Sequence, residues 1–206
     1  MKHLLWMSAI LTFALPLAGC SGPEAEADND PSVSSESALE AKSAFPLNHC
    51  VVRLEPVSSD GNEQVARDSP PTCFRAFSEA IAFATDGRAR ISPDETPETV
   101  TESALNGPSA QSSIVLGIDY EKDNGQGASL TSSAASKCVK GSLYQSGSLP
   151  KGWNDKISSA RTFADCRSTH YEHINFGGAS LPIPRNGYVP KFGALNDETS
   201  SIKWYF

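Results

Sequence analysis

The sequence predicts an all-β fold for the C-terminal part of the chain, a sandwich of two Greek keys, with a small α+β module before it. From Ile114 onward, short apolar runs are separated by Gly, Asn and Ser, a pattern that is typical of short strands joined by turns. In the last of these runs, Ile202, Trp204 and Phe206 recur at every second position, so one face of that strand points to a core. A duplicated pattern also divides this region into two similar halves.

The duplication consists of two motifs that occur twice in the same order. The first is an eleven-residue segment at 120–130 and again at 171–181, in which seven positions are identical. The second is the pattern Asn-Asp-x-x-Ser-Ser at 154–159 and again at 196–201. A repeat of roughly 40 to 50 residues indicates one supersecondary unit used twice, each copy unable to bury its apolar face alone. We therefore expect the two copies to form one domain.

Residues 1–19 have the features of an export signal. A charged start precedes an apolar run over residues 4–17, and the sequence Leu-Ala-Gly-Cys follows at 17–20. The run is too short to span a membrane and fits a signal peptide. Its ending resembles a bacterial lipobox, which implies cleavage before Cys20, lipidation of that cysteine and attachment to the cell envelope. Ser21 in place of an aspartate favours the outer membrane of a Gram-negative cell. The alternative is an ordinary secretory signal, which would also export the protein.

Residues 20–44 are rich in Ser, Glu, Ala, Asp and Pro and have almost no large apolar side chains. Such a composition cannot bury enough surface to offset chain entropy, so we expect a disordered acidic tether. The whole chain has 24 Asp and Glu against 17 Lys and Arg, a formal net charge of −7. This balance argues against nucleic acid or an anionic membrane as partner and leaves the lipid anchor as the expected membrane contact.

Four cysteines remain after Cys20, and export would place them in an oxidising compartment where disulfides persist. Among the three pairings we favour Cys50 with Cys73 and Cys138 with Cys166, because each bridge then closes a loop of moderate length within one part of the chain. A reactive thiol or a metal site is the alternative, although the spacing Cys-x-x-Cys does not occur.

Residues 45–105 are expected to form the α+β module. A strand candidate at 51–54 is followed by a helix after Pro71, which Gly87 would end before a second strand at 88–91. The Cys50–Cys73 bridge would staple this unit, and residues 106–113 would link it to the sandwich. The apolar face of the helix would carry Phe74, Phe77, Ile81 and Ala84.

The hairpin motif and the hexapeptides together point to a known family. In the second copy, Tyr171, Phe176 and Gly178 have the spacing of a tight folded hairpin, in which glycine permits the turn and a ring stacks over the corner. With the duplicated hexapeptides, residues 114–206 resemble a microbial beta/gamma-crystallin domain, with one key over 114–163 and the other over 167–206. The resemblance covers a little under half of the chain and implies two keys paired about a pseudo-two-fold axis.

The same resemblance implies about two Ca²⁺ ions, each held by oxygen atoms from both copies, and oxygen is the ligand that calcium prefers. The implied ligands are the side chains of Asp155, Asp197, Ser158 and Ser200, the backbone carbonyls of Lys156 and Glu198, and oxygens of Glu121 and Glu172 from the partner key. In addition, Asn154 and Asn196 would brace the loops, with Ser159 and Ser201 stabilising them through local hydrogen bonds. The alternative is that both hexapeptides are only Asx and Ser turns.

The first copy departs from the crystallin pattern in two ways. Gly125 stands where the second copy has Phe176, so its hairpin lacks the corner ring and the site near Glu121 would be looser. The interval from hairpin to hexapeptide is also longer, with 34 positions from tyrosine to asparagine against 25 in the second copy. The additional residues are rich in Ser and Gly, and a Cys138–Cys166 bridge would tie them to the connection between the keys.

We expect a calcium-binding, non-enzymatic exported lipoprotein whose crystallin-like domain is stabilised by the ions. Two other classes stay open. One is a secreted proteinase inhibitor of the crystallin-like type, with the Cys138 loop presented to an extracellular protease. The other is a module that binds a surface glycan or an envelope protein through Trp153, Tyr144 or Tyr188.

An enzyme is the class with the least support. The sequence has no serine with a plausible base, no recognisable pair of carboxylates and no phosphate-binding glycine loop. His170 and His173 flank a strand tyrosine at a spacing of three, which puts them on opposite faces of the strand. They could not bind one metal ion together.

Overall fold

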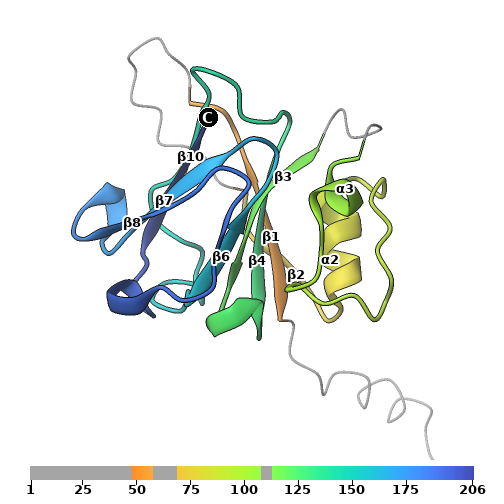
Figure 1. The fold of residues 1–206 in the computed structure, drawn as a ribbon, viewed down its shortest axis with the longest axis horizontal. Coiled ribbons are helices and arrows are strands. Elements are labelled where there is room, and N and C mark those ends of the chain that lie inside the picture. Colours follow the sequence, from red (N-terminus) through yellow and green to blue (C-terminus); the bar gives the residue numbers. More distant parts are fainter. Residues whose placement is uncertain (1–47, 58–68, 108–112) are drawn as a thin grey trace, which may run out of the picture. The chain divides into compact units, whose positions relative to one another are not determined.

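The computed structural model describes residues 48–57, 69–107 and 113–206 (Figure 1). The signal sequence, the lipidation site at Cys20, the acidic tether and most of the 106–113 linker lie outside these ranges. Within the ranges that are described, no helix is long and apolar enough to cross a membrane.

The described strands form two sheets, and short helical segments connect some of the strands along the chain. The first sheet has the order β2 (Thr72–Phe74), β1 (His49–Leu54), β4 (Ser129–Ala134), β3 (Ile114–Tyr120), β6 (Ser159–Thr162) and β9 (Tyr188–Val189). The second has the order β5 (Leu143–Ser146), β10 (Ser201–Tyr205), β7 (Arg167–Tyr171) and β8 (Ser180–Ile183). The helical segments are α2 (Phe77–Ala84), α3 (Glu102–Leu105) and the 3₁₀ turns η2 (Asp123–Gly125), η3 (Ile174–Phe176) and η4 (Gly193–Leu195).

The strand order shows two Greek keys that exchange their third strands. The first key supplies β3, β4 and β6 to the first sheet but places β5 at the edge of the second sheet, beside β10. The second key supplies β7, β8 and β10 to the second sheet and places β9 beside β6. Each sheet is therefore completed by the other copy, which confirms the predicted all-β sandwich of two interdependent keys.

The segment before the sandwich extends the first sheet rather than standing apart from it. Strand β1 runs parallel to β4 over its whole length, and β2 pairs with β1 in antiparallel register. Cys50 and Cys73 face one another in that register and form a disulfide, and Cys138 and Cys166 form a second one, so the favoured pairings are confirmed.

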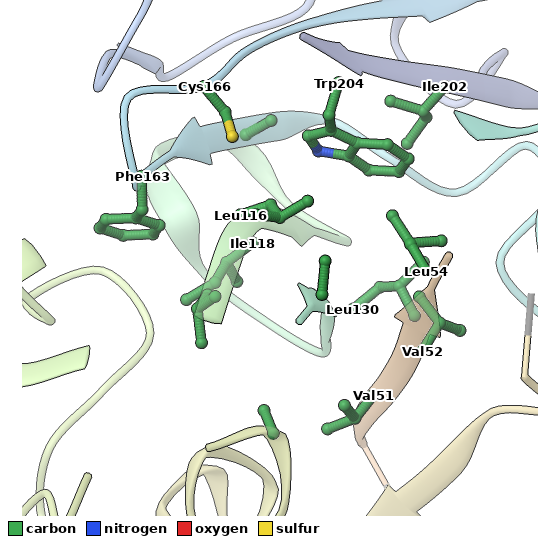
Figure 2. Packing of buried hydrophobic residues seen from close by; sticks show 14 of the residues in the cluster. Val51, Val52, Leu54, Leu116, Ile118, Leu130, Phe163, Cys166, Ile202 and Trp204 are labelled. Atoms are coloured by element: carbon green, nitrogen blue, oxygen red, sulfur yellow. The ribbon is translucent and has the colours of Figure 1, made fainter. Parts of the chain in front are cut away.

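The core lies between the two sheets, and its residues follow strand alternation. Ile202 and Trp204 point from β10 toward Val52 and Leu54 of β1 and Leu116 of β3 (Figure 2). In β3 every residue is buried, whereas in β10 burial is interrupted at Lys203. This difference shows that both faces of the first sheet are covered and that one face of the second is not.

Helix α2 covers part of the outer face of the first sheet by packing against β1 and β4 (Figure 1). Phe77, Ile81 and Ala84 are buried there as predicted, whereas Phe74 belongs to β2 and not to the helix. The prediction of a strand at 88–91 is wrong. The Thr85 hydroxyl accepts a hydrogen bond from the amide of Ala89 at 3.1 Å, which turns the chain back at the end of the helix.

Candidate functional site

The two hairpins of the repeat have the same backbone turn despite their different sequences. Asn124 and Asn175 both adopt left-handed conformations, with φ of 61° and 54°, and so do the next residues, Gly125 at 73° and Phe176 at 65°. Glycine adopts this conformation freely, but an aromatic residue is strained in it. The loss of the corner ring in the first copy has therefore left the hairpin turn intact.

The two hexapeptides lie against one another across the keys. The amide of Asp155 donates to the carbonyl of Thr199 at 3.0 Å, and the amide of Asp197 donates to the carbonyl of Ile157 at 3.1 Å. Both aspartates are left-handed, with φ of 57° and 56°. This reciprocal pairing brings the polar side chains of each copy next to those of the other.

Each aspartate meets the first serine of the opposite hexapeptide. Ser158 Oγ lies 3.1 Å from Asp197 Oδ1, and Ser200 Oγ lies 3.2 Å from Asp155 Oδ1. The serines are buried, at 4% and 7% exposed, whereas the aspartates face solvent. The structure therefore contains two polar cups of the same kind, each built from both keys and open on the carboxylate side.

The neighbouring asparagines and the second serines hold these cups in place. Asn154 Nδ2 donates to Asp155 Oδ2 at 2.6 Å, and the second copy repeats the contact at 2.7 Å between Asn196 and Asp197. The second serines do not bond locally as expected: their hydroxyls donate to the hairpins, Ser159 to Lys122 O at 2.7 Å and Ser201 to His173 O at 2.6 Å. Hairpin and hexapeptide are thus one rigid unit in each key.

The first hairpin glutamate brings its backbone oxygen to a cup. Ser158 Oγ lies 2.8 Å from the backbone oxygen of Glu121, so this hairpin reaches the cup whose aspartate, Asp197, belongs to the other key. The carboxylates close the hairpins: Glu121 accepts from Ala128 N at 3.4 Å and Glu172 from Ala179 N at 2.8 Å. Lys156 Nζ also lies 4.0 Å from the Glu121 carboxylate.

The donor set of the cups suits a hard cation. It consists of carboxylate, hydroxyl and backbone oxygens 2.8 to 3.2 Å apart, which is close enough for a shared ion with calcium–oxygen bonds of about 2.3–2.6 Å. Among the described residues, no group of three or more His, Cys, Asp and Glu side chains is arranged to hold a metal ion. The cups therefore fit an ion that accepts neutral oxygens and do not fit zinc or another soft metal.

A buried polar pair that sequence reasoning missed connects the two keys. His170 Nε2 lies 2.8 Å from Asp119 Oδ1, and both side chains are almost fully buried, at 0% and 3% exposed. Asp119 precedes Tyr120 as His170 precedes Tyr171, so the pair occupies equivalent positions of the repeat. A polar residue directly before each hairpin tyrosine was the available signal.

The aromatic residues proposed for glycan or protein binding are not on an open surface. Tyr144 and Trp153 are 2% and 5% exposed, and Tyr188 is half-buried beneath the guanidinium of Arg161, 4.6 Å from its ring centroid. The Cys138 loop ends in a tight turn, in which the amide of Ser142 donates to the carbonyl of Val139 at 2.8 Å. The buried rings of Tyr144 and Trp153 do not favour glycan or protein binding, whereas the Cys138 loop exposes Val139 and its role as an inhibitor stays a prediction.

Exchanged third strands, paired hexapeptides and repeated hairpins together decide the fold of this region. Residues 114–206 form a beta/gamma-crystallin-like domain. No protein-family profile matches the chain, and no curated protein is similar to it in sequence. The assignment of the crystallin-like domain rests on the strand order and on the internal repeat.

Several solved crystallin structures are similar to part of this chain. One comes from work on the evolution of the eye lens beta-gamma-crystallin domain fold, with 20% identity over 44% of this chain and 86% of that one and a TM-score of 0.36. The N-terminal domain of protein S has 18% identity over 43% of this chain and 93% of its own, with a TM-score of 0.34. A betagamma-crystallin domain from Flavobacterium johnsoniae has 26% identity over 43% and 92%, with a TM-score of 0.32.

Proposed function

We propose that the crystallin-like domain binds about two Ca²⁺ ions and that the ions stabilise the pairing of its keys. The observation that carries the proposal is the reciprocal contact of Ser158 with Asp197 and of Ser200 with Asp155. An ion in either cup would be held by both keys at once. The implied carbonyls of Lys156 and Glu198 follow the two aspartates directly and would complete the ligand sets.

The charge of the cups supports a site of low to moderate affinity. Each cup has one aspartate and otherwise neutral oxygens, and calcium affinity falls with the number of carboxylates. We expect dissociation constants of about 1 μM to 1 mM, which are useful where calcium is abundant, as it is outside cells. Binding to the folded state alone would raise stability by mass action.

The cellular setting is part of the same proposal. Export by the signal sequence and lipidation at Cys20 would place a non-enzymatic, calcium-stabilised domain on the cell envelope. The two disulfides agree with an oxidising compartment, because such bonds rarely persist in the cytosol. Mass spectrometry of the membrane fraction would test the anchor: an unmodified Cys20 in a cleaved or uncleaved chain would contradict it.

The decisive experiment is a calorimetric titration of calcium into the chain from Ser21 onward, with thermal melting of the same sample in calcium and in chelator. We expect about two ions and a higher Tm in calcium. The absence of both binding heat and a shift in Tm would mean that the hexapeptides are structural turns.

Aspartate variants test whether the sites are shared. Asp197→Ala should weaken one ion and leave the other nearly unchanged, whereas Asp155→Ala combined with Asp197→Ala should abolish both, because each cup has one aspartate. Asp94→Ala removes an exposed carboxylate elsewhere and serves as the matched control. Two bound ions in the double variant would refute the assignment.

A further inference from the structure

The repeat gives the two sheets equivalent outer faces. In the first sheet, Ile118 of β3 pairs with Arg161 of β6, which pairs with Tyr188 of β9. In the second sheet, the same positions are held by Thr169 of β7, Lys203 of β10 and Gln145 of β5. We call the first set, together with Tyr120, the covered face, and the second set, together with Tyr171, the open face.

The covered face is occupied by an acidic segment of the chain itself, residues 97–102, which begins in a turn and leads into α3. The hydroxyl of Tyr120 donates to Pro97 O at 2.8 Å, and the guanidinium of Arg161 donates to Val100 O at 2.9 Å. A Cβ placed on Gly125 would lie 3.1 Å from Cβ of Glu98, so the missing ring of the first hairpin makes room for this segment. Burial is complete enough to raise the pKa of the Tyr120 phenol.

The open face lies on the side of the second sheet away from α2 and α3 (Figure 1). None of the described residues covers Lys203, Tyr205 and Tyr171 fully, and all three are partly exposed, whereas their neighbours Ile202 and Trp204 are buried. This face is therefore the one broad strand surface of the sandwich, among the residues described, that has no layer packed on it.

The open face carries cations held against aromatic rings. Arg167 lies over the ring of Tyr205 at 5.7 Å, and Lys203 lies over Phe176 at 4.1 Å. In the described ranges neither of these two cations has a carboxylate within 4.0 Å.

This concentration of positive charge is unusual in a chain of net charge −7. Phe176 adds a second unusual feature, because it keeps a left-handed φ of 65° at a position where the other copy has glycine. A left-handed backbone is strained in a bulky residue. Its ring contacts Tyr171 and Lys203, so the strain maintains the open face.

We propose that the open face binds an acidic peptide segment of a partner protein. The covered face has this kind of occupant on the equivalent surface: a segment that contains Pro, Thr and Glu, whose carbonyls accept hydrogen bonds from Tyr120 and Arg161 and which brings Glu98 next to Gly125. Charge complementarity selects the partner, since cations without carboxylate neighbours attract an anionic chain, and the rings supply apolar contact.

The test uses the chain's own covering segment as a probe. A fluorescein-labelled synthetic peptide of residues 93–103 is titrated with the protein while fluorescence anisotropy is recorded at low and at moderate salt. We expect binding that weakens with salt, and a peptide with Gln and Asn at its four acidic positions should bind more than tenfold less tightly.

Two double variants locate the binding. Arg167→Gln with Lys203→Gln removes two cations of the open face and should weaken binding more than tenfold. Arg75→Gln with Arg90→Gln removes two exposed arginines near α2 and should leave it unchanged. Circular dichroism of each variant confirms that the fold is kept.

Three results would overturn the proposal: equal losses in the two double variants, equal binding of the neutral peptide, or no binding of the acidic peptide. A fourth is tighter binding of vesicles containing phosphatidylglycerol, dependent on Arg167 and Lys203, which would assign the face to an anionic lipid surface. Calcium and chelator are compared throughout. Peptide binding that persists in chelator separates this proposal from the calcium sites.

Discussion

The two Greek keys begin from the same hairpin and diverge according to what covers them. In the first key, Tyr120 is fully buried under the chain's own segment, and a glycine at position 125 lets that segment approach. In the second key, Tyr171 is half-buried and Phe176 forms the corner. The asparagine of the turn and the Asp and Ser side chains of the cups are identical in both copies, whereas the residues that meet a covering layer are not. The internal geometry is therefore the same in both copies, whereas their outer surfaces differ.

The largest difference between the keys should come from their tyrosines. Tyr120→Ala should lower the free energy of unfolding by about 3–5 kcal/mol, because it empties a fully buried site and leaves Pro97 O without its donor. Tyr171→Ala should lower it by about 1 kcal/mol, since that ring is partly in water. Urea unfolding of both variants measures the two values. Similar losses would mean that the segment over the first sheet does not pack as described.

The next largest effect concerns the buried pair of Asp119 and His170, to which each key contributes one residue. Asp119→Ala and His170→Ala should each cost about 3 kcal/mol, because either change leaves the other polar group buried without its partner. The double variant should cost less than the sum of the single changes by about 1 kcal/mol or more. Strict additivity in a double-mutant cycle would show that the pair does not couple the keys.

A smaller effect comes from exchanging the two hairpin corners. Gly125→Phe should cost about 2–3 kcal/mol, because a side chain there meets Glu98 and takes a left-handed backbone. Phe176→Gly should change stability by less than about 1 kcal/mol, as relief of backbone strain offsets the lost ring contacts. Thermal melting of both variants compares them, and the comparison fails if Phe176→Gly is the more harmful change.

The sequence predicted those features that depend on short-range patterns. The repeat located both keys, alternation identified Ile202 and Trp204 as the buried side of β10 but wrongly included the exposed Phe206, and loop length favoured the two disulfides that are present. The reciprocal Ser–Asp contacts also follow from the duplicated hexapeptide. Each correct prediction rests on a local pattern, a loop of moderate length or the internal repeat.

Long-range pairings could not be predicted in the same way. The parallel alignment of β1 with β4 joins segments 80 residues apart, and nothing in a run of apolar residues specifies its neighbour. No strand or helix was expected for residues 97–102, yet Val100 is fully buried on the covered face. The strand expected at 88–91 failed for a local reason, because the amide of Ala89 donates back to the Thr85 hydroxyl at the end of α2.

The smallest expected effect is a difference between the two sheets in how their stability responds to pH. Burial lowers the pKa of His49 below its ordinary value of 6.5. Its Nδ1 lies 2.9 Å from Ser129 Oγ on β4, and its ring packs against Phe77 of α2 at 5.6 Å. The folded state therefore favours the neutral ring, while the unfolded chain takes up a proton at higher pH.

The sign of the pH effect follows from that difference. The contribution of His49 to stability is complete above pH 6.5 and is lost as the pH falls below that value toward the lowered folded pKa. His49 joins β1 to β4. Acid should therefore loosen the pairing of these two strands of the first sheet and leave β7 and β10 of the second sheet unaffected. Hydrogen exchange at pH 7.5 and 5.5 measures this, with His49→Gln as the variant that removes the dependence. If exchange accelerates equally in both sheets, then the acid response arises elsewhere and His49 is not its sensor.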